Sequence, residues 1–143
     1  MPILQLPFGA YELTVFDESP IRSEIFIHLI GPEGRVENHL KALWNVSVFF
    51  PSMHGHKYLA GDYYQSSINA DPERRGLGPL LLDFIATHKN TLGFPFNNLY
   101  STNTAEDKTP VTIAGKALWD KMVRFQNATY NPNLQRYQLT WKI

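Results

Sequence analysis

Cysteine is missing from all 143 residues of the sequence. Its absence excludes a disulfide scaffold, a thiolate metal site and a cysteine nucleophile, and it favours a reducing compartment. The N-terminal MPILQLPFGAYELTVF also lacks the basic start and the cleavage site of a signal peptide. No apolar run approaches the roughly 20 residues of a membrane helix. We therefore expect a cytoplasmic protein with no membrane partner.

A net charge of one sign is missing too, because 13 Lys and Arg residues balance 13 Asp and Glu residues. This balance gives no electrostatic reason to expect nucleic acid as a partner. Hydrophobic residues make up 43% of the chain, which is typical of a globular protein and not of a disordered one. The length predicts a single domain over residues 1–143.

The stretch from Tyr63 to Asn90 is the most informative part of the sequence, because it predicts a strand, a glycine-bearing turn and a helix in succession. The strand side, YYQSSI, suits a half-buried pleated surface and stops at Asp71-Pro72. Pro79 suits the first helical position, so we expect the helix to begin near Gly78. Helical spacing places one apolar face of this helix at Leu77, Leu81, Phe84, Ile85 and His88.

The N-terminus of this helix is a candidate anion site. A helix that follows a glycine turn presents unpaired N–H groups and the positive end of its macrodipole, which suits a phosphate. Arg74 and Arg75 add positive charge beside it. The alternative is purely structural, because glycines end strands in every fold and most such turns bind nothing.

These residues resemble a known family. Glu73 to Gly78, ERRGLG, is similar to the R/Q-x-x-G-x-G/A loop of the GNAT superfamily of acyl-CoA-dependent N-acyltransferases, and GLGPLLLD is similar to small bacteriophage-encoded members. The resemblance implies that this loop holds the pyrophosphate of acetyl-CoA and that the preceding strand pairs with the pantetheine arm. Glu73 and Pro79 depart from the family pattern, and an alternative register would place Leu80 at the final small position. The implied cofactor-binding residues are Ile68, Ala70, Arg74, Arg75, Gly76, Leu77, Gly78 and Leu80.

The N-terminal third is predicted to hold a strand followed by two helices. Residues 11–16, YELTVF, alternate as a strand does, and Asp17 to Pro20 supply helix-start signals. The helical spacing of Ile21, Ile25, His28 and Leu29 favours a helix, although the β-branched run IFIHLI is also compatible with a strand. Similar spacing predicts a second short helix between residues 35 and 45.

The middle of the chain contains a histidine pair. NVSVFF predicts a strand, and SMHGHK predicts a loop that carries His54 and His56. A metal site needs three or four ligands, and no nearby residue completes one at a recognised spacing. We therefore interpret the two histidines as a solvated loop pair and expect no metal.

The C-terminal half continues the alternation of strands and helices. Residues 96–102 predict a strand parallel to the one before it, and Thr109-Pro110 predicts the start of a second long helix, with an apolar stripe at Val111, Ala114, Ala117, Leu118 and Met122. The turn Asn131-Pro132-Asn133 precedes a last strand at residues 137–143. The order predicts an α/β (α+β) fold. The resemblance implies a GNAT-like mixed, mostly antiparallel central sheet with helices on both faces.

The resemblance also suggests where chemistry would occur. Acyl transfer needs a base for the amine and a proton for the departing thiolate. Asp62 opens the central strand, and Tyr100 and Ser101 end the next one, where open α/β sheets place ligand groups. Trp119 stands where the family has a catalytic tyrosine, and indole N–H is no general acid, so we expect Trp119 to pack.

Two functions remain open at this point. The first is an N-acyltransferase that moves an acetyl group from acetyl-CoA to an amine, with a protein or a small molecule as the acceptor. The alternative is a catalytically weak or inactive GNAT-fold binding module, such as a phage protein that binds or inhibits a host protein in the host cytoplasm. Glu73, Pro79 and Trp119 favour the alternative, and the glycine turn with its paired arginines favours the enzyme.

Overall fold

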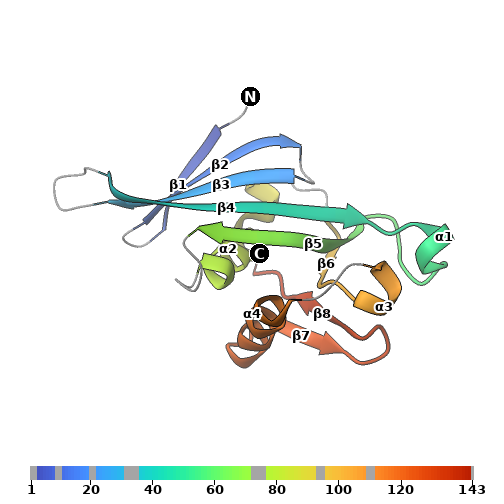
Figure 1. The fold of residues 1–143 in the computed structure, drawn as a ribbon. Coiled ribbons are helices and arrows are strands. Elements are labelled where there is room, and N and C mark those ends of the chain that lie inside the picture. Colours follow the sequence, from blue (N-terminus) through green and yellow to red (C-terminus); the bar gives the residue numbers. More distant parts are fainter. Residues whose placement is uncertain are drawn as a thin grey trace. The chain divides into compact units, whose positions relative to one another are not determined.

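The structure is a computed structural model that describes residues 3–8, 11–19, 22–30, 36–71, 77–92, 96–108 and 112–142 (Figure 1). The chain divides into two compact units. Unit 1 comprises Met1–Asn45 and Ser67–Gly78, and unit 2 comprises Val46–Ser66 and Pro79–Ile143. Among the described residues, no helix is both long and apolar enough to cross a membrane.

Unit 1 is built on antiparallel strands. β1 (Ile3–Phe8) pairs with β2 (Tyr11–Ser19), β2 pairs with β3 (Arg22–Ile30), and β3 pairs with β4 (Val36–Val48), whose last residues belong to unit 2. The pairing of β2 with β3 shifts register between Asp17 and Ser19, and that of β3 with β4 shifts between Leu29 and Ile30. Near the C-terminal end of β4, Asn45 Nδ2 donates a 2.8 Å hydrogen bond to the hydroxyl of Ser67, which also belongs to unit 1.

The prediction of two helices in this region is wrong. The residues expected in the first helix form β3, and those expected in the second form β4. The run IFIHLI is rich in β-branched residues, whose side chains fit a pleated surface. Pairing with strands on both sides then outweighs the helical spacing of the same residues. β1 was missed, and the predicted first strand extends on to Ser19 as β2.

Unit 2 contains a five-stranded mixed sheet within the described part of the chain, in the order β4-β5-β6-β8-β7. β5 (Asp62–Asp71) runs parallel to β6 (Asn98–Tyr100), as predicted. β8 (Arg136–Leu139) is antiparallel to both β6 and β7 (Ala128–Asn131). The prediction of a mixed α/β fold is confirmed at this level.

Helix α2 (Leu77–Leu92) follows β5, as the sequence predicted. Leu81, Phe84 and Ile85 are fully buried, which confirms this part of the predicted apolar face, and Leu82 and Ala86 are buried as well. The helix is broken at His88, whose φ of −118° and ψ of 15° are not helical. Helix α2 is therefore a central element of the unit 2 core.

Helix α4 (Ile113–Arg124) is capped by Thr112, whose hydroxyl accepts a 2.9 Å hydrogen bond from the Gly115 amide. The expected start at Thr109-Pro110 lies outside the described residues, as do the side chains of Val111 and Ala114. The predicted apolar stripe is correct for buried Met122 and wrong for Ala117, which is exposed. Trp119 is buried, so the inward face is rotated toward it.

The last two strands form a hairpin beside α4 (Figure 1). The predicted turn at Asn131 is confirmed, because its side-chain oxygen accepts hydrogen bonds from the amides of Asn133 and Leu134. The predicted final strand was placed too late, since β8 runs from Arg136 to Leu139, and β7 was missed. Two further helices have four residues each, α1 (Pro51–His54) and α3 (Thr104–Asp107).

Candidate functional site

The three predicted catalytic residues lie along the short parallel pairing of β5 with β6, with Asp62 at its start, Tyr100 at its end and Ser101 directly after it. The parallel register joins Asp62 to Asn98 and Tyr64 to Tyr100, and β6 then ends. The buried carboxylate of Asp62 accepts hydrogen bonds from the Leu59 amide at 3.0 Å and from Asn98 Nδ2 at 2.9 Å. Asp62 therefore has a fixed orientation at the start of the strand pair.

Tyr100 is brought close to Asp62. Its ring is buried and lies 5.9 Å, centroid to centroid, from the rings of Phe49 and Tyr58. Burial raises the pKa of the Tyr100 hydroxyl, and the negative charge of Asp62 raises it further. The hydroxyl therefore keeps its proton at neutral pH, as a proton donor must.

Ser101 has a different environment. Its hydroxyl accepts a 2.9 Å hydrogen bond from the Tyr137 amide, and its own amide donates to the Tyr137 carbonyl. These two bonds join the end of β6 to β8. The side chain of Ser101 is thereby committed to holding the sheet together, and of the two hydroxyls only that of Tyr100 has no hydrogen-bond partner among the described residues.

The predicted cofactor-binding residues lie on β5 and the first turns of α2. Ile68 and Ala70 are in β5, and Leu77, Gly78 and Leu80 are in α2. Ile68, Gly78 and Leu80 are half-buried. Arg74, Arg75 and Gly76, which carry most of the predicted phosphate site, lie outside the described residues.

Sequence reasoning missed a group of buried charges in the described part of unit 2, which centres on Arg136. This side chain is fully buried on β8. Its guanidinium donates to both oxygens of Asp107, with Nη1–Oδ2 at 2.6 Å and Nη2–Oδ1 at 2.5 Å. It also donates to the Ser101 carbonyl at 2.9 Å and to the Tyr58 hydroxyl at 2.7 Å. A two-point contact of this kind fixes both partners, because the planar guanidinium matches the carboxylate.

Aromatic rings surround the buried guanidinium. Its central carbon, Cζ, lies 4.9 Å from the ring centroid of Phe49, 5.3 Å from that of Tyr58 and 5.4 Å from that of Tyr64. Phe49 and Tyr58 stack on each other at 3.6 Å. Ring faces attract cations, so this box offsets part of the cost of removing the arginine from water. We call Phe49, Tyr58, Tyr64 and Tyr100 the aromatic box.

His54 belongs to the same network, and its interpretation as part of a solvated loop pair is wrong. The imidazole is buried, accepts a 3.0 Å hydrogen bond from the Phe50 amide on Nδ1, and bonds Asp107 Oδ1 through Nε2 at 2.8 Å. These partners specify a neutral ring with its proton on Nε2. The short helix α1, where a loop was predicted, turns the ring inward. His56 is exposed, as predicted.

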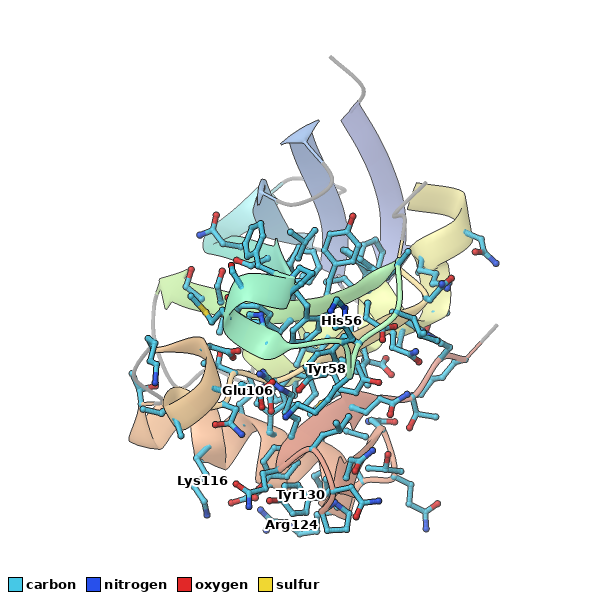
Figure 2. The ribbon with its side chains drawn as sticks, turned by 90° about the vertical axis from the view of Figure 1, so that its right-hand side faces the viewer. His56, Tyr58, Glu106, Lys116, Arg124 and Tyr130 are labelled. Atoms are coloured by element: carbon cyan, nitrogen blue, oxygen red, sulfur yellow. The ribbon has the colours of Figure 1, made fainter. Side chains whose placement is uncertain are left out.

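The Arg136 network combines charged side chains with tyrosine hydroxyls, and Figure 2 labels two of its members, Tyr58 and Glu106. Burial opposes ionisation of Asp107, but hydrogen bonds from Arg136 and the Asn103 amide outweigh it and lower the pKa of the carboxyl. Burial raises the pKa of Tyr58 to about 12, and Glu106 adds to this effect. Glu106 Oε2 pairs with Lys57 Nζ at 3.1 Å, whereas the buried Oε1 lies 3.7 Å from Arg136 Nη2 without a hydrogen bond.

Comparison with protein-family models, curated proteins and solved structures finds no match to this chain. The described residues contain no group of three or more His, Asp or Glu side chains arranged to hold a metal ion. The candidate site therefore consists of Asp62 and Tyr100 at the ends of the parallel strands. Arg136 contacts the rings of Phe49 and Tyr58, and these two rings in turn contact the ring of Tyr100.

Proposed function

We propose that the protein is an acyl-CoA-dependent N-acyltransferase of the GNAT type, with acetyl-CoA as co-substrate and an amine as acceptor. The observation that carries the proposal is the pairing of β5 with β6, which covers only Asp62 to Tyr64 of the longer strand. β5 continues to Asp71, beyond the end of this pairing. An extended ligand such as the pantetheine arm can hydrogen-bond to a strand that outruns its neighbour.

The start of α2 supports the same proposal. This helix begins at Leu77, within the glycine-bearing segment Glu73 to Gly78, and Gly78 and Pro79 lie in its first turn. Free amides at a helix start suit the pyrophosphate of coenzyme A. The absence of an amide on Pro79 costs no hydrogen bond within the helix, because first-turn amides have no intrahelical acceptor.

The proposed reaction uses residues at the ends of β5 and β6. A neutral amine attacks the thioester carbonyl, a new C–N bond forms, and the C–S bond breaks to release a thiolate. The amine must lose a proton, and the thiolate must gain one. Tyr100, protonated at neutral pH, is the proposed proton donor to the sulfur, and Asp62, whose charge raises the pKa of Tyr100, is the proposed acceptor of the amine proton.

A binding module without turnover is the second candidate. Trp119 stands at the sequence position of the family's catalytic tyrosine, and Tyr100 is proposed to take over its role. The two side chains are only 4% and 6% exposed, so both are largely enclosed. If the hydroxyl of Tyr100 does not reach the donor, the chain would bind coenzyme A and release it unchanged.

Calorimetry with acetyl-CoA tests the proposal. Gly78→Glu should abolish binding, because it places a carboxylate at the proposed phosphate position, whereas Asn90→Glu adds the same charge at the opposite, exposed end of α2 and should not. At a ligand concentration of about 100 times Kd, wild-type protein should gain roughly 2.7 kcal/mol of stability. Absence of binding at millimolar acetyl-CoA would exclude both candidates.

Turnover separates the enzyme from the binding module. With an amine acceptor in hand, Tyr100→Phe should lower kcat by about 10²-fold or more and leave acetyl-CoA affinity unchanged. Tight acetyl-CoA binding with no transfer to lysine peptides, N-terminal peptides or small amines would favour the binding module.

A further inference from the structure

The surface at the end of α4 combines exposed cations with exposed aromatic rings. Lys116, Lys121 and Arg124 are exposed on the helix, and Asp120 is the only acidic residue in it. Phe125, directly after the helix, is 63% exposed, and Tyr130 on β7 is 49% exposed. Lys116, Lys121, Arg124, Phe125 and Tyr130 together are called the α4–β7 surface.

Side-chain contacts join the helix and strand parts of this surface. Asp120 accepts a hydrogen bond from the Tyr137 hydroxyl, and the Tyr137 ring lies 4.9 Å from that of Tyr130. Lys116 Nζ lies 3.3 Å from Asp120 Oδ2, one turn further along the helix, and Arg124 lies one turn beyond Asp120. Figure 2 shows Lys116, Arg124 and Tyr130 at the same edge of the molecule.

Asp120, the one carboxylate of α4, is already bonded to Lys116 and Tyr137. The hydrogen bond from Tyr137 is the main cause of the lowered pKa of Asp120, and the charges of Lys116 and Arg124 lower it further. Among the described residues, Lys121 and Arg124 have no ion-pair partner. The surface therefore keeps a local excess of positive charge in a chain whose formal net charge is zero.

Structural explanations account for part of this surface. Cations in the last turn of a helix interact favourably with its macrodipole, and single exposed aromatic residues are common. Neither explains why both Phe125, directly after the helix, and Tyr130, on the following strand, are exposed. Aromatic rings and arginine are enriched at the centres of protein interfaces and are the residues that most often dominate binding energy.

We propose that the α4–β7 surface docks an acidic protein segment that carries an apolar side chain. The unpaired cations are complementary to carboxylates, and the exposed rings offer contact area to an apolar anchor. Nucleic acid fits less well, because a neutral chain lacks the extended positive field that drives phosphate binding. None of these residues belongs to the proposed acyl-CoA loop, so this inference stands apart from the proposed function.

Fluorescence anisotropy with the full chain tests the proposal. The probe is a fluorescein-labelled peptide in which Glu and Asp residues flank a central Trp, and it should bind saturably and more weakly as salt rises. The double variant Lys121→Glu/Arg124→Glu should weaken binding by roughly tenfold or more, because like charges then face each other. Tyr130→Ser should also weaken binding while leaving the salt dependence unchanged.

Lys108→Glu is the matched control. Lys108 is an exposed lysine directly after α3 and is not part of the α4–β7 surface, so its charge reversal should leave binding unaltered. All substituted side chains are exposed, and thermal melting should show that each variant folds. The proposal is overturned if the acidic peptide does not bind saturably, or if the double variant binds as well as wild type. Tighter binding of labelled oligo-dT than of the peptide would assign the surface to nucleic acid instead.

Discussion

Arg136 and Asp107 lie 29 residues apart in the sequence and share two hydrogen bonds in the interior of unit 2. Both side chains are fully shielded from solvent. Asp107 comes from a one-turn helix and Arg136 from the final hairpin, so the pair joins α3 to β8. The geometry makes either residue costly to remove alone, because its partner would remain as a buried, uncompensated charge.

Asp107→Ala should therefore lower the free energy of unfolding by about 3 to 5 kcal/mol. Arg136→Leu should have a similar effect, and the double variant should be more stable than the sum of the two losses predicts, because no charge is left unpaired. Urea unfolding of all four proteins measures this coupling. Lys116→Ala, which removes an exposed ion pair, is the control and should have little effect. Additive losses would show that the two residues act independently.

Stability should fall in alkali because of Tyr58. Folding holds the pKa of this phenol at about 12, whereas an unfolded tyrosine ionises near 10. Its contribution to stability is therefore complete below pH 10 and is lost as the pH rises toward about 12. Urea midpoints measured on both sides of pH 10 should fall less for Tyr58→Phe than for wild type. Equal losses in the two proteins would remove Tyr58 as a cause.

Trp119 should behave as a core residue. It is 4% exposed, and its ring stacks on that of Tyr137 at 6.1 Å, with 17° between the ring planes. Trp119→Ala should cost about 3 to 5 kcal/mol of stability in urea unfolding. Phe125→Ala, which removes an exposed ring directly after α4, should cost far less. A Trp119→Ala protein of wild-type stability that no longer binds acetyl-CoA would place the indole in the binding site.

The segment around α2 could be predicted from the sequence because its signals are local. Asp71-Pro72 ends the strand, Pro79 fits a first helical turn, and the spacing of Leu81, Phe84 and Ile85 specifies a buried helix face. Each of these signals acts within a few residues. The structure adds the break at His88, for which the sequence has no such signal.

The strand β3 could not be predicted in the same way. Ile25 and Leu29 fit a helical period of 3.6, and Ile25, Ile27 and Leu29 fit a strand period of 2 equally well. What decides between the two is pairing with other segments, since Ile25 lies opposite Val15 of β2 and Ala42 of β4. A single-sequence pattern contains no information on these partners.

The same limit applies to the candidate site. Asp62 and Tyr100 could be proposed because each ends or begins a predicted strand, and the parallel pairing, which is three residues long, keeps Asp62 at its start close enough to raise the pKa of Tyr100 at its end. Arg136 could not, because arginine is almost never fully buried and no spacing links it to Asp107 or to His54. Only the folded arrangement of α1, α3 and β8 reveals their contact.

The two four-residue helices, α1 and α3, are closed by the same kind of hydrogen bond, and this affects how they open to solvent. In α1 the last side chain, His54, accepts the amide of Phe50, and in α3 the last side chain, Asp107, accepts the amide of Asn103. His54 and Asp107 are also bonded to each other. A single helical turn is not stable alone, so neither can release its amide while the other stays closed. The amide protons of Phe50 and Asn103 should therefore exchange with solvent through one shared opening event, although the two residues are 53 positions apart in the sequence, as are His54 and Asp107.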